Sequence, residues 1–136
     1  FNQPSGITTD GTNLYVADSM NHLIRKIVIS TGVVTTVAGT GSSGSANGTG
    51  TSASFNQPSG ITTDGTNLYV ADSMNHLIRK IVISTGVVTT VAGTGSSGSA
   101  NGTGTSASFN QPSGITTDGT NLYVADLGNH LIRQIE

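Results

Sequence analysis

The sequence predicts an all-β protein built from repeated antiparallel sheets, and three observations lead to this prediction. Residues 55–108 repeat residues 1–54 letter for letter, and residues 109–136 begin a third copy of the same unit. Each unit contains short runs rich in Val, Ile and Thr that are separated by Gly, Asn, Asp and Ser, a pattern typical of strands joined by tight turns. No window of the chain has apolar residues at helical spacing.

Four strands are expected in each unit. In the first unit the expected strands are residues 6–10, 13–18, 22–30 and 33–39. The first hairpin turn is marked by Asp10-Gly11, a dipeptide that favours hairpin turns. The second strand has apolar residues on both of its faces, so we expect the sheet to be covered on both sides.

A four-stranded sheet that is covered on both sides needs a neighbour on each side. Radial stacking of such sheets as the blades of a β-propeller meets this need and leaves few free edges. A linear β-solenoid is the main alternative, but solenoid repeats are usually much shorter than 54 residues. We therefore expect blade 1 at residues 1–54 with a Gly/Ser-rich linker at 39–54, blade 2 at 55–108 with a linker at 93–108, and a partial blade 3 at 109–136 that lacks its fourth strand.

The pattern P-S-G-I…D-G…N-L-Y-V-A-D-S-M-N-H-L-I-R-K-I resembles the NHL repeat, which is named for its Asn-His-Leu triplet. The triplet occurs at residues 21–23, 75–77 and 129–131, and the resemblance covers about forty residues of each unit. The resemblance implies a β-propeller, commonly six-bladed, in which each unit supplies one blade. Because three blades cannot close a ring, we expect two chains to complete six blades as a homodimer. The alternative is that these residues are one piece of a longer chain whose N-terminus supplies the missing fourth strand.

The linkers carry a second motif, GTGSSG, whose spacing fits the Gly-rich loop of dinucleotide-binding domains. That loop must be followed by a helix that packs against a sheet. Residues 45–50 contain only small polar residues, Ala and Gly, so they have no apolar stripe with which a helix could pack. We therefore interpret the linkers as spacers that cross the surface between blades.

The polar residues that recur in every unit are the candidate site residues. We expect them to form a structural motif that comprises Asp18, Asn21, His22 and Arg25, with their equivalents Asp72, Asn75, His76, Arg79, Asp126, Asn129, His130 and Arg133. No catalytic residue and no metal ligand is expected, because identical blades place the same residue at symmetric points, whereas an active site needs different residues at one point.

Each recurring residue has an expected role. Asp18 is expected to accept hydrogen bonds from the amides of residues 19–21, as in an Asx turn. His22 is expected to bond the backbone of this turn, since blades pack about 10 Å apart and their histidines are then too distant to share a metal. Arg25 lies on the same strand face as apolar residues, so we expect it to be partly buried and paired with a carboxylate of the neighbouring blade, the equivalent there of Asp10 or of Asp18.

Composition excludes several classes of partner. Charged residues make up 9% of the chain, against about a quarter in typical proteins, and its five Lys and Arg residues form no basic patch. Binding to nucleic acid or to an anionic membrane is therefore not expected. The chain contains no Cys, which excludes disulfides and thiolate metal sites, and no cofactor is expected.

These observations favour a non-enzymatic repeat scaffold for protein interaction or display, with itself and a protein or peptide ligand as partners. The identity of the units indicates recent duplication or deliberate design. Two alternatives follow from the resemblance: a lyase or hydrolase propeller with a central metal, and an RNA-binding NHL domain, which would need a basic face. The lack of Cys and the excess of Thr, Ser and Asn weakly favour a secreted or cell-surface bacterial protein.

Overall fold

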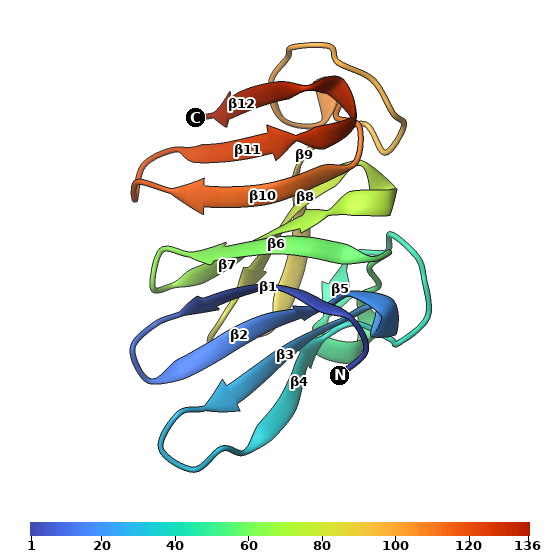
Figure 1. Ribbon diagram of the computed structural model, residues 1–136. Helices are drawn as coiled ribbons and strands as arrows, with labels where there is room; N and C mark the ends of the chain where they lie inside the picture. The colour runs from blue at the N-terminus through green and yellow to red at the C-terminus, as the bar shows by residue number, and fades with distance from the viewer.

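The computed structural model describes residues 1–136 and consists of three successive antiparallel sheets, which are the predicted blades (Figure 1). In the first blade, neighbouring strands pair in chain order. The strands are β1 (Pro4–Thr9), β2 (Asn13–Asp18), β3 (Leu23–Val28) and β4 (Val34–Ala38). They match the four strands that the sequence predicts.

The second and third blades repeat this meander. The second contains β6 (Pro58–Thr63), β7 (Asn67–Asp72), β8 (Leu77–Val82) and β9 (Val87–Ala92), and the third contains β10 (Pro112–Thr117), β11 (Leu122–Asp126) and β12 (Leu131–Ile135). Short 3-10 turns follow some strands and linkers: η1 (Ser19–Asn21), η2 (Gly50–Ser52), η3 (Ser73–Asn75), η4 (Gly104–Ser106) and η5 (Leu127–Asn129). The eleven strands that the repeats predict are confirmed.

One further strand comes from the first linker. The two-residue strand β5 (Gly48–Thr49) pairs with the outer edge of β9, with Gly48 opposite Val88, and makes the second blade five-stranded. A Cβ atom on Gly48 would lie 3.0 Å from the carbonyl carbon of Ser52, so glycine permits this close approach. The linker therefore runs from one blade to the next and adds a short strand to the blade that follows it.

The blades stack so that their first strands line one side of the molecule. Figure 1 shows β1, β6 and β10 side by side, although they belong to three separate sheets. The Ser5 hydroxyl donates to the carbonyl of Ser59 over 2.9 Å, which links β1 to β6. Gly60 lies so close to the carbonyl oxygen of Ser113 that a Cβ atom at this position would collide with it.

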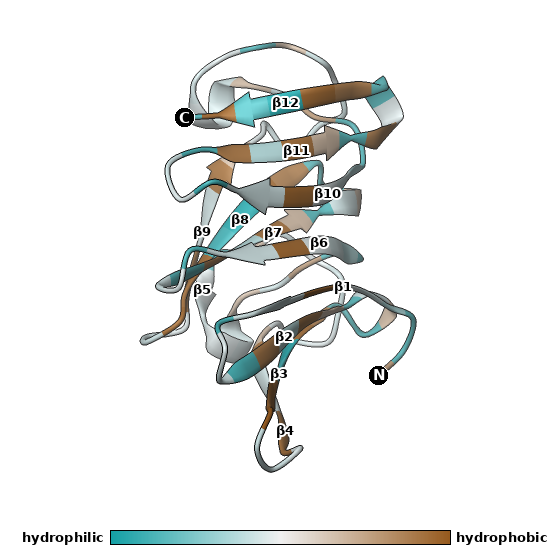
Figure 2. Ribbon diagram, turned by 60° about the vertical axis from the view of Figure 1, so that its left-hand side comes forward, coloured by the Kyte–Doolittle hydropathy of each residue, from teal (hydrophilic) through white to brown (hydrophobic).

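The hydrophobic core lies between the blades. Tyr15 and Ile24 of the first blade belong to the same buried cluster as Ile61 and Val70 of the second. A second cluster joins the second blade to the third through residues that include Ile78 and Val124. Figure 2 shows the hydrophobic stretches concentrated in the strands and the hydrophilic ones in the turns. Burial on both faces, which the sequence predicts, is most extensive in the middle blade, where Val70 belongs to one cluster and Ala71 to the other.

Candidate functional site

The recurring polar residues form one cluster per blade, and the cluster of the second blade is the most enclosed. Its centre is Asp72, a fully buried carboxylate in which one oxygen accepts from the backbone amide of Asn56 over 2.8 Å. The other oxygen accepts from Asn75 Nδ2 and from Arg79 Nη1, each over 2.8 Å. The carboxylate thus ties the start of the blade to the turn η3 and to β8.

Arg79 is the second centre of this cluster, and the linker folds over it. Its guanidinium donates to the carbonyl oxygens of Ser54 and Ala46, each over 3.0 Å, and to Oδ1 of Asn47 over 2.9 Å. The guanidinium carbon also lies 5.1 Å from the centre of the Phe55 ring, in cation–π geometry. Arg79 therefore organises the linker, which has almost no side chains that could pack on their own.

The same cluster has different surroundings in the three blades. Arg79 is completely buried, whereas 21% of the Arg25 side chain is exposed, because no linker precedes the first blade within the described residues. Arg25 contacts Asp18 at 3.1 Å and the Phe1 ring at 5.2 Å. Arg133 has the linker again, and it repeats all the bonds of Arg79 with the equivalent residues of the third blade.

The pKa of the buried aspartate differs between the first and second blades. Burial raises the pKa of Asp72 above its ordinary value, although the Asn56 amide, Asn75 and Arg79 act in the opposite direction. Burial also acts to raise the pKa of Asp18, but here the amide of Asn2 and the side chains around it outweigh burial, and the pKa is lowered. Asp72 is the more enclosed of the two, and the charged amino terminus of Phe1 also acts to lower the pKa of Asp18.

Two predicted roles in this cluster are wrong. Asp18 does not accept from the amides of residues 19–21; it accepts from the Asn2 amide over 2.7 Å and from the Asn21 side chain over 3.0 Å. Arg25 pairs with Asp18 of its own blade rather than with a carboxylate of the neighbouring blade. The reason is the register of the hairpin, which sets Val16 opposite Arg25 and places Asp18 diagonally across from it.

The histidines connect successive blades. His22 follows η1 with a φ angle of 56°, a left-handed conformation that turns the chain into β3. Its Nδ1 accepts from the backbone amide of Gln57 over 3.1 Å, and Nδ1 of His76 accepts in the same way from Gln111 over 3.1 Å. The predicted bond to the turn's own backbone is therefore wrong, because the acceptor faces the next blade.

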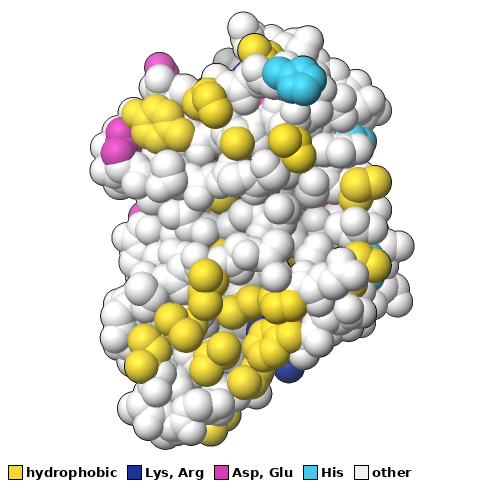
Figure 3. Space-filling view, in the orientation of Figure 1, with side chains coloured by type: hydrophobic (Ala, Val, Ile, Leu, Met, Phe, Trp, Pro, Cys, Tyr) yellow, Lys and Arg dark blue, Asp and Glu magenta, His cyan; other side chains and the backbone are white.

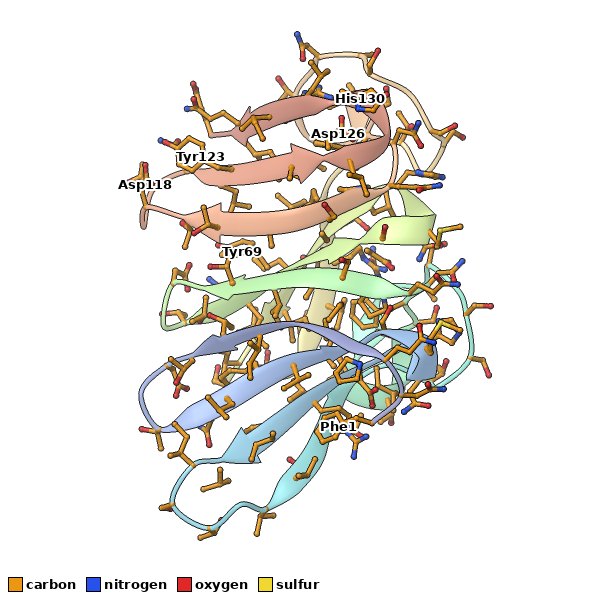
Figure 4. The ribbon with its side chains drawn as sticks, viewed as in Figure 1. Phe1, Tyr69, Asp118, Tyr123, Asp126 and His130 are labelled. Atoms are coloured by element: carbon orange, nitrogen blue, oxygen red, sulfur yellow. The ribbon has the colours of Figure 1, made fainter.

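The Asp-Gly turns are structural, as the sequence predicts. In the third blade, Oδ1 of Asp118 accepts from the backbone amides of Asn121 over 2.7 Å and Thr120 over 2.8 Å. The Tyr123 hydroxyl donates to the other oxygen over 2.9 Å, and Figure 4 shows these two side chains together at the end of the hairpin. These bonds, with the Asn121 amide the strongest, lower the pKa of Asp118 to about 2. The charged carboxylate in turn raises the pKa of Tyr123.

Sequence reasoning missed two members of the cluster, Asn47 and Phe55. Both were assigned to the linker or to the start of a unit, where no strand pattern marks them. The signal that could have found them is position: Phe begins every unit, and Asn occurs once in each linker. A buried Arg needs several acceptors, and the linker carbonyls and Asn47 supply them.

The outer faces of the first and third blades are apolar and exposed. Ile7 is 60% exposed, whereas its equivalent Ile61 is 5% exposed between blades. Ile132 is 78% exposed, whereas its equivalent Ile78 is completely buried. Figure 3 shows apolar side chains gathered over the first blade and a smaller group over the third. The two end faces are therefore the two unpaired halves of an interface that forms twice within the chain.

The structure brings together no group of three or more His, Asp or Glu side chains that could hold a metal ion. None of its helical segments has the length and apolar character needed to cross a membrane.

Comparison with known proteins gives concordant results. A family model described as NHL repeat matches residues 109–135. The whole chain is 35% identical to part of human NHL repeat-containing protein 2 and spans about a fifth of that protein's length, 21%.

Solved structures show the same fold. A Bacteroides thetaiotaomicron protein of unknown function matches 90% of this chain with a TM-score of 0.83 and 30% identity, and 32% of that chain is covered. An auxiliary nutrient binding protein from the same organism matches 96% of this chain with a TM-score of 0.82 and 28% identity, and 36% of that chain is covered.

Proposed function

This chain belongs to the NHL-repeat β-propeller family, and from that premise we propose that it is a non-enzymatic interaction scaffold whose open end faces bind further blades, first of all those of a second copy. The observation that carries the proposal is the pair of apolar end faces, which repeat the two sides of an interface already formed inside the chain.

The end faces are complementary. The face of the third blade presents Tyr123, Ala125 and Ile132, which correspond to residues that the first blade buries against the second. The face of the first blade presents Ile7 and Ile27, whose equivalents in the second blade, Ile61 and Ile81, are buried. Packing the third blade of one copy on the first blade of another therefore reproduces the internal contact.

Such head-to-tail contacts join unlike faces, so they form a closed ring when the rotation per blade permits it and an open filament when it does not. Two chains supply six blades, the number common in the family, and we expect a closed homodimer. Burying one isoleucine contributes about 1.5–3 kcal/mol, so each copy gains substantially from covering Ile7 and Ile132.

The recurring polar residues support a scaffold rather than an enzyme. Asp72, Asn75 and Arg79 use their polar atoms on backbone and on one another, and His76 accepts a bond from the next blade. A catalytic group needs a free polar atom within reach of a substrate. The bonds that these side chains make hold blades and linkers together, and the one buried atom of theirs that lacks a partner, Nε of Arg79, is enclosed.

The test is the absolute solution mass measured by light scattering on a sizing column. We expect a single species of twice the chain mass, and we expect Ile7→Asp to shift it to the chain mass because a charge would then be buried in the end-face contact. Met74→Asp is the matched control, since Met74 is also exposed but lies in the turn η3. A wild-type chain that stays monomeric, or an Ile7→Asp variant that stays dimeric, would contradict the proposal.

A further inference from the structure

Two hydrogen bonds between neighbouring blades use a histidine ring as the acceptor. Nδ1 of His22 accepts from the backbone amide of Gln57, and Nδ1 of His76 accepts from the backbone amide of Gln111, each over 3.1 Å. Both histidines are half-buried, so their rings can exchange protons with solvent. Both bonds lie between blades of one chain, and neither involves an end face of the stack.

The donor of the first bond is fixed by its own blade. The residue before Gln57 is Asn56, whose amide donates to Asp72 over 2.8 Å and whose carbonyl accepts from the amide of Met74 over 3.1 Å. Because the peptide unit is planar and trans, the N–H of Gln57 points away from that carbonyl. It is therefore presented to His22 of the preceding blade in a fixed direction.

The donor of the second bond is held in the same way, since the carbonyl of Asn110 accepts from the amide of Gly128 over 2.8 Å. Gln57 and Gln111 both have left-handed φ angles, of 50° and 52°. Gln3 has the same conformation, with a φ of 47°, although no histidine accepts from its amide. Each blade therefore sets the direction of this amide by itself, whatever the state of the histidine.

A proton added to the ring turns this bond into an unfavourable contact. A neutral imidazole has one nitrogen that accepts and one that donates, whereas both nitrogens of the protonated ring donate. The N–H of Gln57 then faces a second N–H, on Nδ1 of His22. Because the blade holds the amide in place, the amide cannot turn to another acceptor, and the bond is lost.

We propose that His22 and His76 form pH-dependent contacts, which hold each blade to the next while the ring is neutral and are lost when the ring is protonated. Histidine gains this proton between about pH 8 and about pH 5. The folded chain favours the neutral ring, so the unfolded chain binds more protons in this range, and the stability of the stack falls as the pH falls. This inference does not depend on assembly through the end faces.

The other charged side chains of the joined blades are paired or lie elsewhere. The buried pairs are Asp18 with Arg25, Asp72 with Arg79 and Asp126 with Arg133. The remaining aspartates occupy the Asp-Gly turns, at the opposite end of each blade from its histidine, as Figure 4 shows for Asp118 and His130; they are Asp10, Asp64 and Asp118. Lys26 and Lys80 lie within the sheets, opposite tyrosines.

Asp72 is the paired carboxylate whose titration acts against the histidines. Burial raises its pKa above the ordinary value, so its protonation favours the folded chain as the pH falls. This effect has the opposite sign to that of the histidine contacts. It is also present in every variant compared below, so it cancels from their differences.

Urea denaturation at several pH values tests the histidine contacts. The parent carries Ile7→Asp, at a position that is 60% exposed, so that assembly of copies does not contribute. The test variant adds His22→Asn and His76→Asn, because asparagine tolerates a left-handed φ and does not titrate. Between about pH 8 and about pH 5, the unfolding equilibrium constant of the parent should rise at least about tenfold more than that of the test variant, because two hydrogen bonds are lost.

The matched control is His130→Asn in the same parent. His130 has the same left-handed conformation, with a φ of 58°, but no amide donates to its ring. The control should therefore keep the pH dependence of the parent. A test variant with the same pH dependence as the parent, or a control that flattens the profile as much as the test variant does, would overturn the proposal.

A second measurement uses the unaltered chain. Proton–nitrogen NMR spectra follow the amides of Gln57 and Gln111 during a pH titration, and carbon spectra follow the rings of His22 and His76. The single variants His22→Asn and His76→Asn assign the signals of the identical repeats. We expect each amide proton to move upfield with the same midpoint as the ring that accepts from it. Amide signals that stay in place while the rings gain protons would overturn the proposal, whether or not two copies assemble.

Discussion

Three arginines that occupy the same position of the repeat show how far surroundings set the role of a residue. Arg79 has four bonded acceptors and no exposure, whereas Arg25 has Asp18 and the Phe1 ring. An arginine of the first kind both neutralises a buried carboxylate and fixes a linker. Arg25 neutralises the carboxylate of Asp18 but fixes no linker, and its side chain is partly exposed to solvent.

The two arginines therefore respond differently to the same substitution. Arg79→Ala leaves Asp72 buried without its charge partner, and we expect a loss of about 3–5 kcal/mol in the free energy of unfolding. Arg25→Ala removes one bond to a charged group at a partly exposed site, and we expect a loss of about 1–3 kcal/mol. Urea denaturation at a fixed protein concentration measures both. Equal losses would contradict the role assigned to the linker.

The Asp-Gly turns give a prediction about pH. The bonds from Asn121, Thr120 and Tyr123 stabilise the charged form of Asp118 and hold its pKa at about 2. Because the folded pKa lies below the unfolded value of about 3.9, the contribution of this carboxylate to stability is complete above that unfolded value and is lost as the pH falls through about 2.

NMR titration of the side-chain carboxyl carbons measures this pKa directly, and the spectrum of Asp118→Asn assigns the signal. We expect a midpoint of about 2 in the unaltered chain. Tyr123→Phe removes one donor and should move the midpoint part of the way toward the ordinary value, since the two backbone amides remain. A midpoint near the ordinary value in the unaltered chain would contradict the turn geometry.

At the scale of elements, the linkers and turns decide how one blade meets the next. The turn η3 ends in His76, whose φ of 57° directs its ring toward the following blade, where Gln111 donates to it. His130 has the same conformation after η5, with a φ of 58°, but no blade follows it within the described residues. Figure 4 shows His130 at the outer end of the stack.

Alanine variants of these two histidines separate two contributions to the free energy of unfolding, that of the hydrogen bond between blades and that of the left-handed backbone. His76→Ala and His130→Ala both replace a left-handed histidine with a left-handed alanine, so the change in backbone energy is the same in the two variants. His76→Ala also removes the bond to Gln111, so we expect it to lose about 0.5–1.5 kcal/mol more. Thermal or urea unfolding of the two variants, both made in the monomeric Ile7→Asp background, gives the difference, because in the proposed dimer the amide equivalent to that of Gln111 would come from the second copy. No difference would mean that this bond contributes nothing to holding the blades together.

The sequence predicts the meander well and the linker poorly, for a physical reason. The eleven meander strands carry alternating and β-branched residues, so their strand character is visible in their own letters. β5 is Gly-Thr, which has no such character, and it is a strand because the edge of β9 lies beside it. Gly102–Thr103 has the same letters and is no strand. Tertiary context alone separates the two.

The cluster of recurring polar residues could also be predicted only in part from the sequence. The burial of the recurring arginine is predicted from its strand face, and its pairing with an aspartate from charge alone. Which aspartate it meets depends on hairpin register, and which carbonyls it meets depends on how the linker folds back. Neither is encoded in the identity of a single residue.

At the scale of the whole molecule, the blade architecture follows from the repeat, but the closure of the ring does not. Identical units fix one interface and therefore one rotation per blade, whereas the number of blades depends on the exact size of that rotation. Ile7 and Ile132 are exposed because they lie on the two end faces of the stack, where this interface has no second blade within the described residues. The solution mass is the measurement that counts the blades.

The folding of each linker onto the following blade also sets the frame in which this repeat forms one complete blade. Arg79, Asn47 and β5 tie residues 39–54 to the strands of residues 58–92, so the complete unit runs from residue 39 to residue 92. This unit has the same 54-residue period as the repeat, shifted by sixteen positions from a cut made at Phe55. A protein engineer who excises or multiplies this blade should cut before Gly39 and after Ala92. A cut at Phe55 would remove residues 39–54 and leave Arg79 without the linker that it anchors.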